Sequence, residues 1–454
     1  MTRTTAPSPH PTGPHPTGVS PREVLALAVP ALATLVAEPL FLLADTAMVG
    51  HLGTPALAGL GVAGAALSTA VSVFVFLAYA TTAVVARQRG AGRSDEALAA
   101  GVDGIWLALG LGVLVAVPTA LFAPTVNGWF GAGPEAVAAA TTYLRISALG
   151  IPAMLAVLAC SGVLRGFLDT RTPLVTAVAG FSANIVLNYL LIYVADLGIA
   201  GSAWGTVIAQ NGMAAALLVV VLRRAVAAGA VLRPHLGRVL RAALGGVPLL
   251  VRTLALRVAM LATTWAAAGF GDLTLAAHQV VFTMFGLLAL ALDALAIAAQ
   301  AFTGSTLGAG DRDGTLALTR LLTRWGVWGG VALTVVLVAT AWILPPLFSS
   351  DVDVQHRIVA GLLVLAVFQP VAGVVFVLDG VLIGAGDGRA LAWLQAVVLV
   401  PYLPVLVWLR LDADRFTSWW GIAALWAAFG WFLCCRAVAL VMRERSGRWM
   451  RLGA

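Results

Sequence analysis

The sequence has very little charge and no lysine at all. Of its 454 residues, 10% are charged and 61% are hydrophobic, which is too little charge to cover a soluble protein of this length. Without lysine the phosphate-binding loop GxxxxGK[ST] cannot occur, so an ATP-driven pump built on that loop is excluded. The hydrolase motifs HExxH and GxSxG are absent as well, and we therefore expect no enzyme.

Cysteine is scarce too, and its three positions form no site. Cys160, Cys434 and Cys435 all fall inside apolar runs, and none has a metal-ligand spacing with histidine. Three thiols in apolar helices make no disulfide framework, so each is expected to be a small buried hydrophobe. The sequence predicts neither a bound cofactor nor a cluster of metal ligands.

Long apolar runs dominate the chain instead. A bilayer span takes roughly 20 apolar residues. The chain has twelve such runs, at roughly 24–49, 56–85, 98–122, 137–164, 173–195, 200–222, 246–269, 274–305, 316–344, 355–383, 390–410 and 418–442. The segment 1–20 is rich in Pro, Thr, Gly and His and has no apolar core, which predicts a disordered tail rather than a signal peptide. We expect an all-α membrane protein with 12 transmembrane helices.

All the basic residues are arginines, and they gather in alternate loops. One side holds Arg87, Arg89, Arg93, Arg165, Arg171, Arg223, Arg224, Arg233, Arg238, Arg241, Arg312, Arg389, Arg443, Arg445, Arg448 and Arg451. The other side holds few, mainly Arg357, Arg410 and Arg415. The positive-inside rule then places both termini in the cytoplasm and the chain in the inner (plasma) membrane. Because these charges are scattered over short loops, nucleic acid is not an expected partner.

The chain repeats itself at one constant spacing, which we call the repeat offset. The matching anchors are Pro30 with Pro248, Gly90-Ala91-Gly92 with Gly308-Ala309-Gly310, Pro152 with Pro370, and SGVLRGFLDTR (161–171) with DGVLIGAGDGR (379–389). Each half holds six spans, an even number, so both halves have the same orientation. They should be two lobes related by a pseudo-two-fold axis along the membrane normal. Such duplication is typical of transporters that work by alternating access, although a channel or membrane enzyme could inherit it.

The repeat and the charge distribution together predict five segments. These are a disordered tail (1–20), an N-terminal six-helix lobe (21–222), a basic cytoplasmic linker (223–243), a C-terminal six-helix lobe (244–443) and a basic cytoplasmic tail (444–454). No feature of the sequence indicates a second subunit, so we expect a monomer surrounded by lipid.

Carboxylates inside the spans are the main functional candidates, because one at the bilayer centre costs about 2.5–3.5 kcal/mol. They are Glu38, Asp45, Asp103, Asp293 and Asp379. Asp45 is the leading candidate. It lies in the same span as Pro30 and after it, and Pro30 should bend the helix. The repeat equivalent of Asp45 is the uncharged Thr263. Burial disfavours the charged form of a carboxylate, which suits proton exchange. The alternative is a carboxylate at the outer end of a helix.

The remaining acids are secondary candidates or structural residues. Glu38 lies two helical turns before Asp45, on the same helix face. Asp293 and Asp379 could line a pore, or pair with Arg252 or Arg257 in structural ion pairs. Asp103 is expected near the cytoplasmic interface, and His278 is expected to be a packing residue rather than a proton relay.

Polar residues of two further spans could surround the leading carboxylate. Asn184 and Asn188 are spaced i, i+4 and share one helix face. Their amides could hydrogen-bond a carboxylate, or simply hold helices together. Thr206 is a weaker candidate by itself.

Four segments resemble the multidrug and toxic compound extrusion (MATE) family. They are ADTAMVGHLGTPALAGLGVA (44–63), LRGFLDTRTP (164–173), AAHQVV (276–281) and ALDALAIAAQAFTGSTLGAGD (291–311), the last being typical of its DinF branch. The resemblance covers about 24–442. It implies a V-shaped pair of lobes that exports organic, often cationic compounds in exchange for protons or sodium.

The resemblance also assigns roles to particular residues. Asp45 matches the family's coupling carboxylate, and Pro30 matches the proline at which the first helix bends. Asn184, Asn188 and Thr206 match the polar cluster around that carboxylate. DinF-like members often carry an acid at the position of Asn188, which leaves Asp45 as the single acid of its cluster here.

We therefore expect a proton-coupled antiporter of organic, cationic or amphipathic compounds, with no cofactor beyond an ion gradient. The alternatives are a sodium-coupled version, with Na⁺ at Asp45, or an exporter or flippase of a lipid-linked or secondary metabolite. A flippase should carry arginines in its cavity, whereas this sequence places them mainly in loops.

Overall fold

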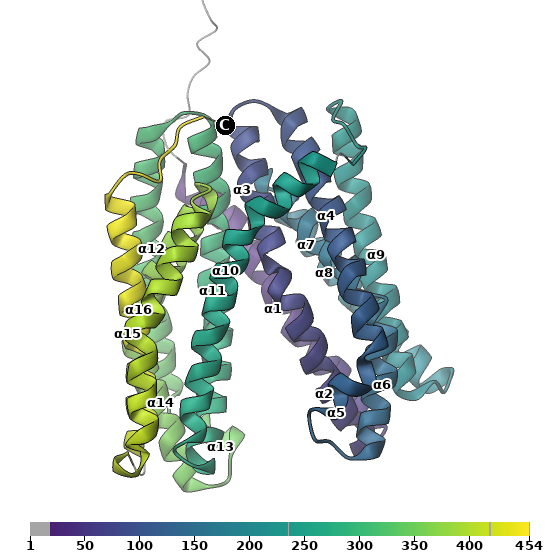
Figure 1. Cartoon of the computed structure of the whole chain (residues 1–454), viewed down its shortest axis with the longest axis vertical. Helices are drawn as coiled ribbons and strands as arrows, with labels where there is room; N and C mark the ends of the chain where they lie inside the picture. Colours follow the sequence, from purple (N-terminus) through teal and green to yellow (C-terminus); the bar gives the residue numbers. More distant parts are fainter. Residues whose placement is uncertain (1–18, 235, 417–418, 454) are drawn as a thin grey trace, which may run out of the picture.

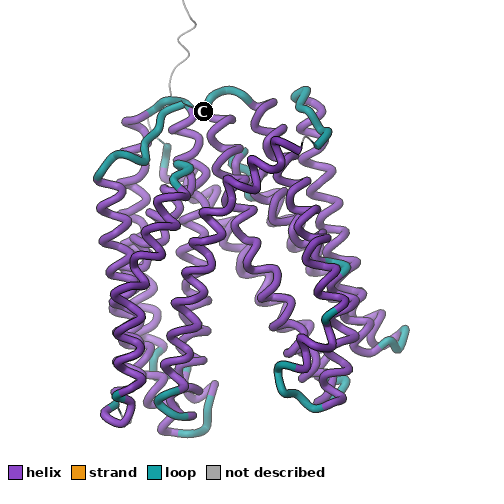
Figure 2. The backbone as a smooth tube through the Cα atoms, in the orientation of Figure 1, coloured by secondary structure: helices purple, strands orange, loops and turns teal. Residues whose placement is uncertain are grey.

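The computed structural model describes residues 19–234, 236–416 and 419–453, and these residues form helices and loops without a strand (Figure 2). The N-lobe contains α1 (Pro21–Gly50), α2 (Thr54–Ser72), η1 (Val73–Val75), α3 (Phe76–Gly90), α4 (Ser94–Leu121), α5 (Ala123–Gly128), α6 (Pro134–Ala148), α7 (Ile151–Gly166), α8 (Arg171–Tyr189), the π-helical turn η2 (Leu190–Val194) and α9 (Gly198–Ala227). The C-lobe contains α10 (Leu236–Ala268), α11 (Asp272–Gly308), α12 (Arg312–Thr340), α13 (Pro345–Phe348), α14 (Val352–Gly384), α15 (Gly388–Leu411), η3 (Ala413–Arg415) and α16 (Trp419–Arg445).

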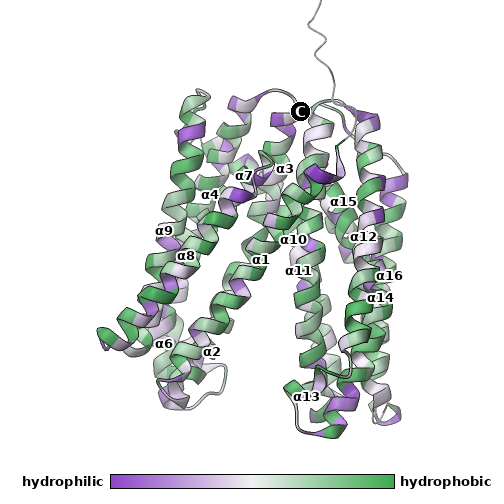
Figure 3. Ribbon diagram, turned by 180° about the vertical axis from the view of Figure 1, so that it is seen from behind, coloured by the Kyte–Doolittle hydropathy of each residue, from purple (hydrophilic) through white to green (hydrophobic). Residues whose placement is uncertain are grey.

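The two lobes form a V. Figure 1 shows them converging at the end where the C-terminus lies and diverging at the opposite end, with α1 and α11 on the inner edges. Hydrophobic residues run along the helix shafts (Figure 3). Large apolar side chains such as Leu43 and Val335 are exposed there, as expected for surfaces that face acyl chains.

The number of long apolar helices confirms the sequence prediction. Among the described residues 11 helices are long and apolar enough to cross a membrane, and a bent pair raises the number to 12. The bent pair is α6 and α7, which meet at 50°. Pro152 lies in the first turn of α7, where its missing N–H is harmless. Its repeat equivalent Pro370 lies inside the unbroken α14, so the repeated proline does not by itself break the helix.

The lobes touch through their backbones at the converging end. A Cβ atom on Gly90 would lie 2.0 Å from the carbonyl oxygen of Ser305, and one on Gly308 would lie 2.0 Å from that of Arg87. Both pairs are related by the repeat offset, so one contact is made twice, between α3 and α11, as a pseudo-two-fold axis requires. Glycine is needed at both places because any side chain would push the lobes apart.

The repeated Asp of the DTR and DGR segments ties each lobe to its own last helix. Asp169 accepts a hydrogen bond of 2.6 Å from Arg224 of α9, and Asp387 binds Arg443 of α16 at 2.7 and 3.0 Å. Partial burial opposes ionisation of Asp169, yet hydrogen bonds from Thr172 and Arg224 hold its pKa below the usual value. This role explains why the acid recurs in both halves.

The helix ends can be compared with the predicted segments. Ser20 caps α1 and forms a capping box with Glu23, so helix order begins at residue 21; residues 1–18 of the predicted tail lie outside the described residues. Much of the segment 223–243 is helical, because α9 runs to Ala227 and α10 begins at Leu236. The predicted tail 444–454 begins inside α16.

The end of the chain packs at the converging end of the V. Trp449 is buried, and the Gly453 N–H donates to the Leu307 carbonyl at 3.0 Å. Arg87 of α3 donates to the carbonyls of Gly453 at 2.6 Å, Ala385 at 2.9 Å and Arg451. One N-lobe side chain therefore joins the C-lobe and the segment that follows it.

Candidate functional site

Asp45 lies near the end of α1 and is only 2% exposed. Its Oδ1 accepts a hydrogen bond of 2.8 Å from the Asn188 amide of α8 and one of 2.7 Å from the Ser202 hydroxyl of α9. Both donors are neutral, and among the described residues no arginine or histidine forms an ion pair with this carboxylate. Oδ2 accepts neither of these bonds, which leaves it to take up a proton.

The helix ends around Asp45 are shaped for this contact. Asn188 sits in the last turn of α8, and the π-helical turn η2 begins directly after that helix; such turns often mark functional sites. On α9, a Cβ atom at Gly205 would lie 1.9 Å from Asn188 Oδ1. The missing side chain lets α9 approach closely enough for Ser202 and Asn188 to reach the same oxygen.

One of the three polar residues predicted around Asp45 contacts it, and so does a serine that was not predicted. Asn184, Asn188 and Thr206 are all buried around α8 and α9, and Asn188 contacts Asp45. No hydrogen bond from Asn184 or Thr206 to Asp45 occurs within the described part of the chain. Sequence reasoning missed Ser202, although it lies one helical turn before Thr206 and therefore on the same face of α9.

Glu38 and Pro30 are the other two candidates on α1. Glu38 shares a face of α1 with Asp45, but its side chain is exposed whereas Asp45 is covered by α8 and α9. Helix α1 continues through Pro30 and Pro39, and the Pro30 carbonyl accepts a 2.9 Å bond from the Thr34 hydroxyl. The bending role of Pro30 stays a prediction.

The repeat equivalent of the site in the C-lobe is uncharged. Thr263 takes the place of Asp45, and its hydroxyl meets that of Tyr402 at 2.6 Å. Tyr402 in turn corresponds to Asn184 at the same offset. Both residues are buried, so a neutral pair fills the position that holds the carboxylate in the N-lobe.

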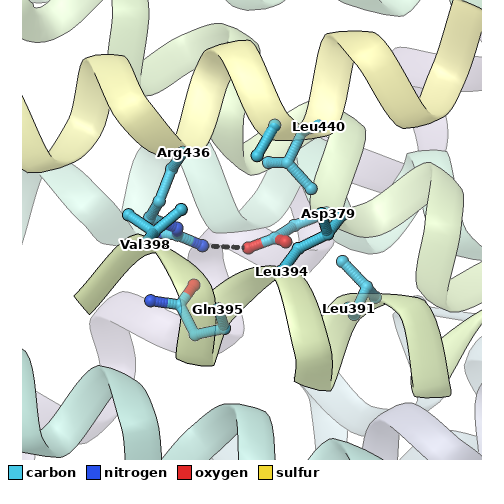
Figure 4. Close-up of a pocket in the computed structure, with 8 residues that line it drawn as sticks. Asp379, Leu391, Leu394, Gln395, Val398, Arg436 and Leu440 are labelled. Carbon is cyan, nitrogen blue, oxygen red and sulfur yellow. Dashed lines mark hydrogen bonds and ion pairs between the residues drawn. The ribbon is translucent and has the colours of Figure 1, made fainter. Parts of the chain in front are cut away.

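Asp379 forms a structural ion pair, one of the two alternatives that the sequence left open. Its Oδ2 accepts a bond of 2.6 Å from Arg252 of α10 and one from Arg436 of α16. Figure 4 shows Arg436 and Asp379 beside a small cavity that Gln395 also lines. Two guanidinium groups neutralise this carboxylate, so it lacks the freedom that Asp45 has. The sequence analysis had not singled out Arg436.

Asp293 faces charges from both lobes. Arg165 and Tyr79 of the N-lobe and Arg252 of the C-lobe act on its carboxylate. Arg165 was expected in a loop, as a residue that sets topology, but it lies in the last turn of α7, where its charge acts on Asp293. The expectation of a loop position is therefore wrong for Arg165, whereas Arg252 lies within a span as expected.

The other two candidates have the structural roles expected of them. His278 is fully buried beside Trp426 and Phe282, and its Nε2 lies 3.2 Å from the Thr264 hydroxyl. Asp103 pairs with Arg238 at 2.8 Å.

Comparison with known proteins agrees with this architecture. The MatE family matches the chain twice, over residues 30–190 and 248–408, and these two ranges are themselves related by the repeat offset that joins Pro30 to Pro248. The chain therefore belongs to the MatE family of membrane transporters, the multidrug and toxic compound extrusion proteins.

Individual relatives span nearly the whole chain. Protein DETOXIFICATION 44, chloroplastic, of Arabidopsis thaliana is 33% identical over 94% of this chain and 83% of its own. DNA damage-inducible protein F of Escherichia coli is 30% identical over 93% and 92%. The structure of the Vibrio cholerae MATE transporter VcmN in the bent form aligns with a TM-score of 0.84 at 21% identity, covering 95% of this chain and 97% of that one. The likeness to VcmN shows a shared fold.

Proposed function

We propose that this protein is a secondary antiporter that exports organic compounds, cationic or amphipathic, in exchange for protons that bind Asp45. The contrast between two buried carboxylates carries the proposal. Asp379 is neutralised by two guanidinium groups, whereas the donors that Asp45 has among the described residues, Asn188 and Ser202, are neutral. A proton can neutralise Asp45, and its binding changes the hydrogen bonds that join α1 to α8 and α9.

The transport cycle follows from the V and the repeat. With the V open to the outside, Asp45 takes up a proton and the organic compound leaves. The N-lobe repacks, the lobes rock about their converging end, and the proton is released to the cytoplasm as another molecule binds. Solved relatives named as MATE in the straight and in the bent conformation support a cycle with two states. In this proposal both termini lie in the cytoplasm and the protein lies in the plasma membrane, which the distribution of arginines between the loops supports.

Uptake of a fluorescent organic cation into inverted vesicles tests the coupling ion. An acidic lumen is expected to drive saturable uptake that a protonophore abolishes, because proton exit drives cation entry; about 2.3 kcal/mol per charge is available at 100 mV. A sodium gradient without a pH gradient should give no uptake. The reverse result would establish the sodium-coupled alternative, and uptake independent of both gradients would contradict antiport.

Ser202→Ala is expected to slow efflux about three- to fivefold with unchanged protein levels. The change removes one of the two hydrogen bonds to Asp45, and such a bond between membrane helices is worth about 0.6–1 kcal/mol. Ser161→Ala is the matched control, since Ser161 is also a buried serine but belongs to α7. Equal effects of the two variants would show that Ser202 acts through packing alone.

A further inference from the structure

A cavity of about 1200 Å³ lies at the converging end of the V. Its walls are α3 and α4 of the N-lobe, the first half of α10, the loop between α14 and α15, and the chain end at Trp449 and Arg451. Ligand pockets commonly measure about 300–1,000 Å³, so this space is large enough for a substantial molecule. It is distinct from the Asp45 site, because Asp45, Asn188 and Ser202 do not line it.

The charged lining of this cavity has an excess of arginine. It contains Arg87, Arg238, Arg241, Arg389, Arg451, Glu96, Asp103 and Asp387. Each acid already has a cation: Glu96 pairs with Arg93, Asp103 with Arg238, and Asp387 with Arg443. No carboxylate of the described residues forms an ion pair with Arg241 or Arg389. Within the described residues the cavity therefore offers an anion the guanidinium groups of Arg241 and Arg389, and Arg451 also lacks a carboxylate partner there.

The first turns of α10 have a residue pattern that is typical of a helix at the level of the lipid headgroups. Arg238 and Arg241, spaced i, i+3, line the cavity on one face. Leu236 and Leu240, which do not line the cavity, are exposed, Leu236 by 82%. A helix with arginines on one face and exposed leucines on another is typical of the membrane interface.

The cavity also has an apolar wall that continues towards the bilayer. Leu244 of α10 and Val84 of α3 both line it and are both exposed, Val84 by 48%. An acyl chain can cover these side chains, whereas a free inorganic anion would leave them uncovered. The combination of these guanidinium groups and an apolar wall fits an amphipathic anion better than a soluble one.

We propose that this cavity binds an anionic phospholipid of the adjoining leaflet. Its phosphate lies between Arg241 and Arg389, and an acyl chain covers Leu244 and Val84. Basic pockets between transmembrane helices are known to hold such headgroups. Since Arg241 belongs to α10, Arg389 to α15 and Val84 to α3, the lipid touches both lobes and stabilises their contact at the converging end.

Native mass spectrometry of the full-length protein, titrated with phosphatidylglycerol or phosphatidylcholine, tests this site. Phosphatidylglycerol is expected to bind and to raise the melting temperature, and phosphatidylcholine to do neither. The double variant Arg241→Ala/Arg389→Ala should weaken phosphatidylglycerol binding about thirtyfold, from the electrostatic contribution of two interfacial arginines. The Arg241→Lys/Arg389→Lys variant keeps both charges and should retain most of the binding.

Arg312→Ala is the matched control, because Arg312 is exposed at the start of α12 and does not line the cavity. Equal loss of binding in this control would overturn the proposal, since the lipid would then be responding to net charge. Equal binding of the two lipids would overturn it as well. Stabilisation by inorganic phosphate to the same extent would replace the lipid with a free anion.

Discussion

Asp45→Asn is expected to abolish efflux while the protein still folds and reaches the membrane. Asparagine has the size of aspartate, and its side-chain oxygen can accept the same bonds from Asn188 and Ser202. The local packing of α1, α8 and α9 therefore remains. The amide cannot gain or lose a proton near neutral pH, so the step that couples the ion gradient to the lobes is lost.

Drug-resistance assays in cells and cation uptake by inverted vesicles both measure this loss. Asp272→Asn is a suitable control because Asp272 is an exposed acid in the first turn of α11, and it should transport normally. Full efflux by Asp45→Asn, at equal protein levels, would refute coupling through Asp45. Substrate binding without turnover would instead place the defect in the coupling step.

Asp379→Ala is expected to destabilise the C-lobe by about 3–5 kcal/mol, the usual cost of leaving buried cations without their anion. Removing the carboxylate of Asp379 takes away the counter-ion of Arg252 and Arg436, and both arginines are buried. Thermal unfolding in detergent should show a lower midpoint and a larger aggregated fraction. The loss should occur at any pH at which both guanidinium groups are charged.

A triple variant separates stability from transport. Arg252→Met/Asp379→Leu/Arg436→Met replaces the whole ion triad with apolar side chains of similar size, and such replacements are often neutral or stabilising. We expect it to recover most of the stability that Asp379→Ala loses. An Asp379→Ala protein of normal stability that fails to transport would contradict the structural role and make Asp379 a second coupling residue.

The repeat offset made much of the fold predictable. It predicted two lobes, and the structure shows why the matched residues recur. Gly90 and Gly308 each contact the backbone of the opposite lobe. Asp169 and Asp387 each bind the last helix of their own lobe. The geometry of such contacts allows only one residue type at each position. These residues are therefore the same in both halves, whereas other positions differ between the halves.

The partners of the buried charges could not be predicted in the same way. Sequence spacing tells which residues share a face of one helix, but not which helices become neighbours. Asn188 was found because it shares a face with Asn184. Ser202, Arg165 and Arg436 were missed because their partners lie on other helices, far away along the chain.

The contact that Gly90 and Gly308 make between the lobes also determines how far the lobes would move when they rock. An α-helix rises about 1.5 Å per residue, so the 37 residues of α11 form an arm of about 55 Å from its end at Gly308. A rotation of about 10° at this contact would move the far end of that arm by about 10 Å. Because the lobes meet here through backbone atoms, a small rolling of one surface on the other could close the wide end without unfolding any helix.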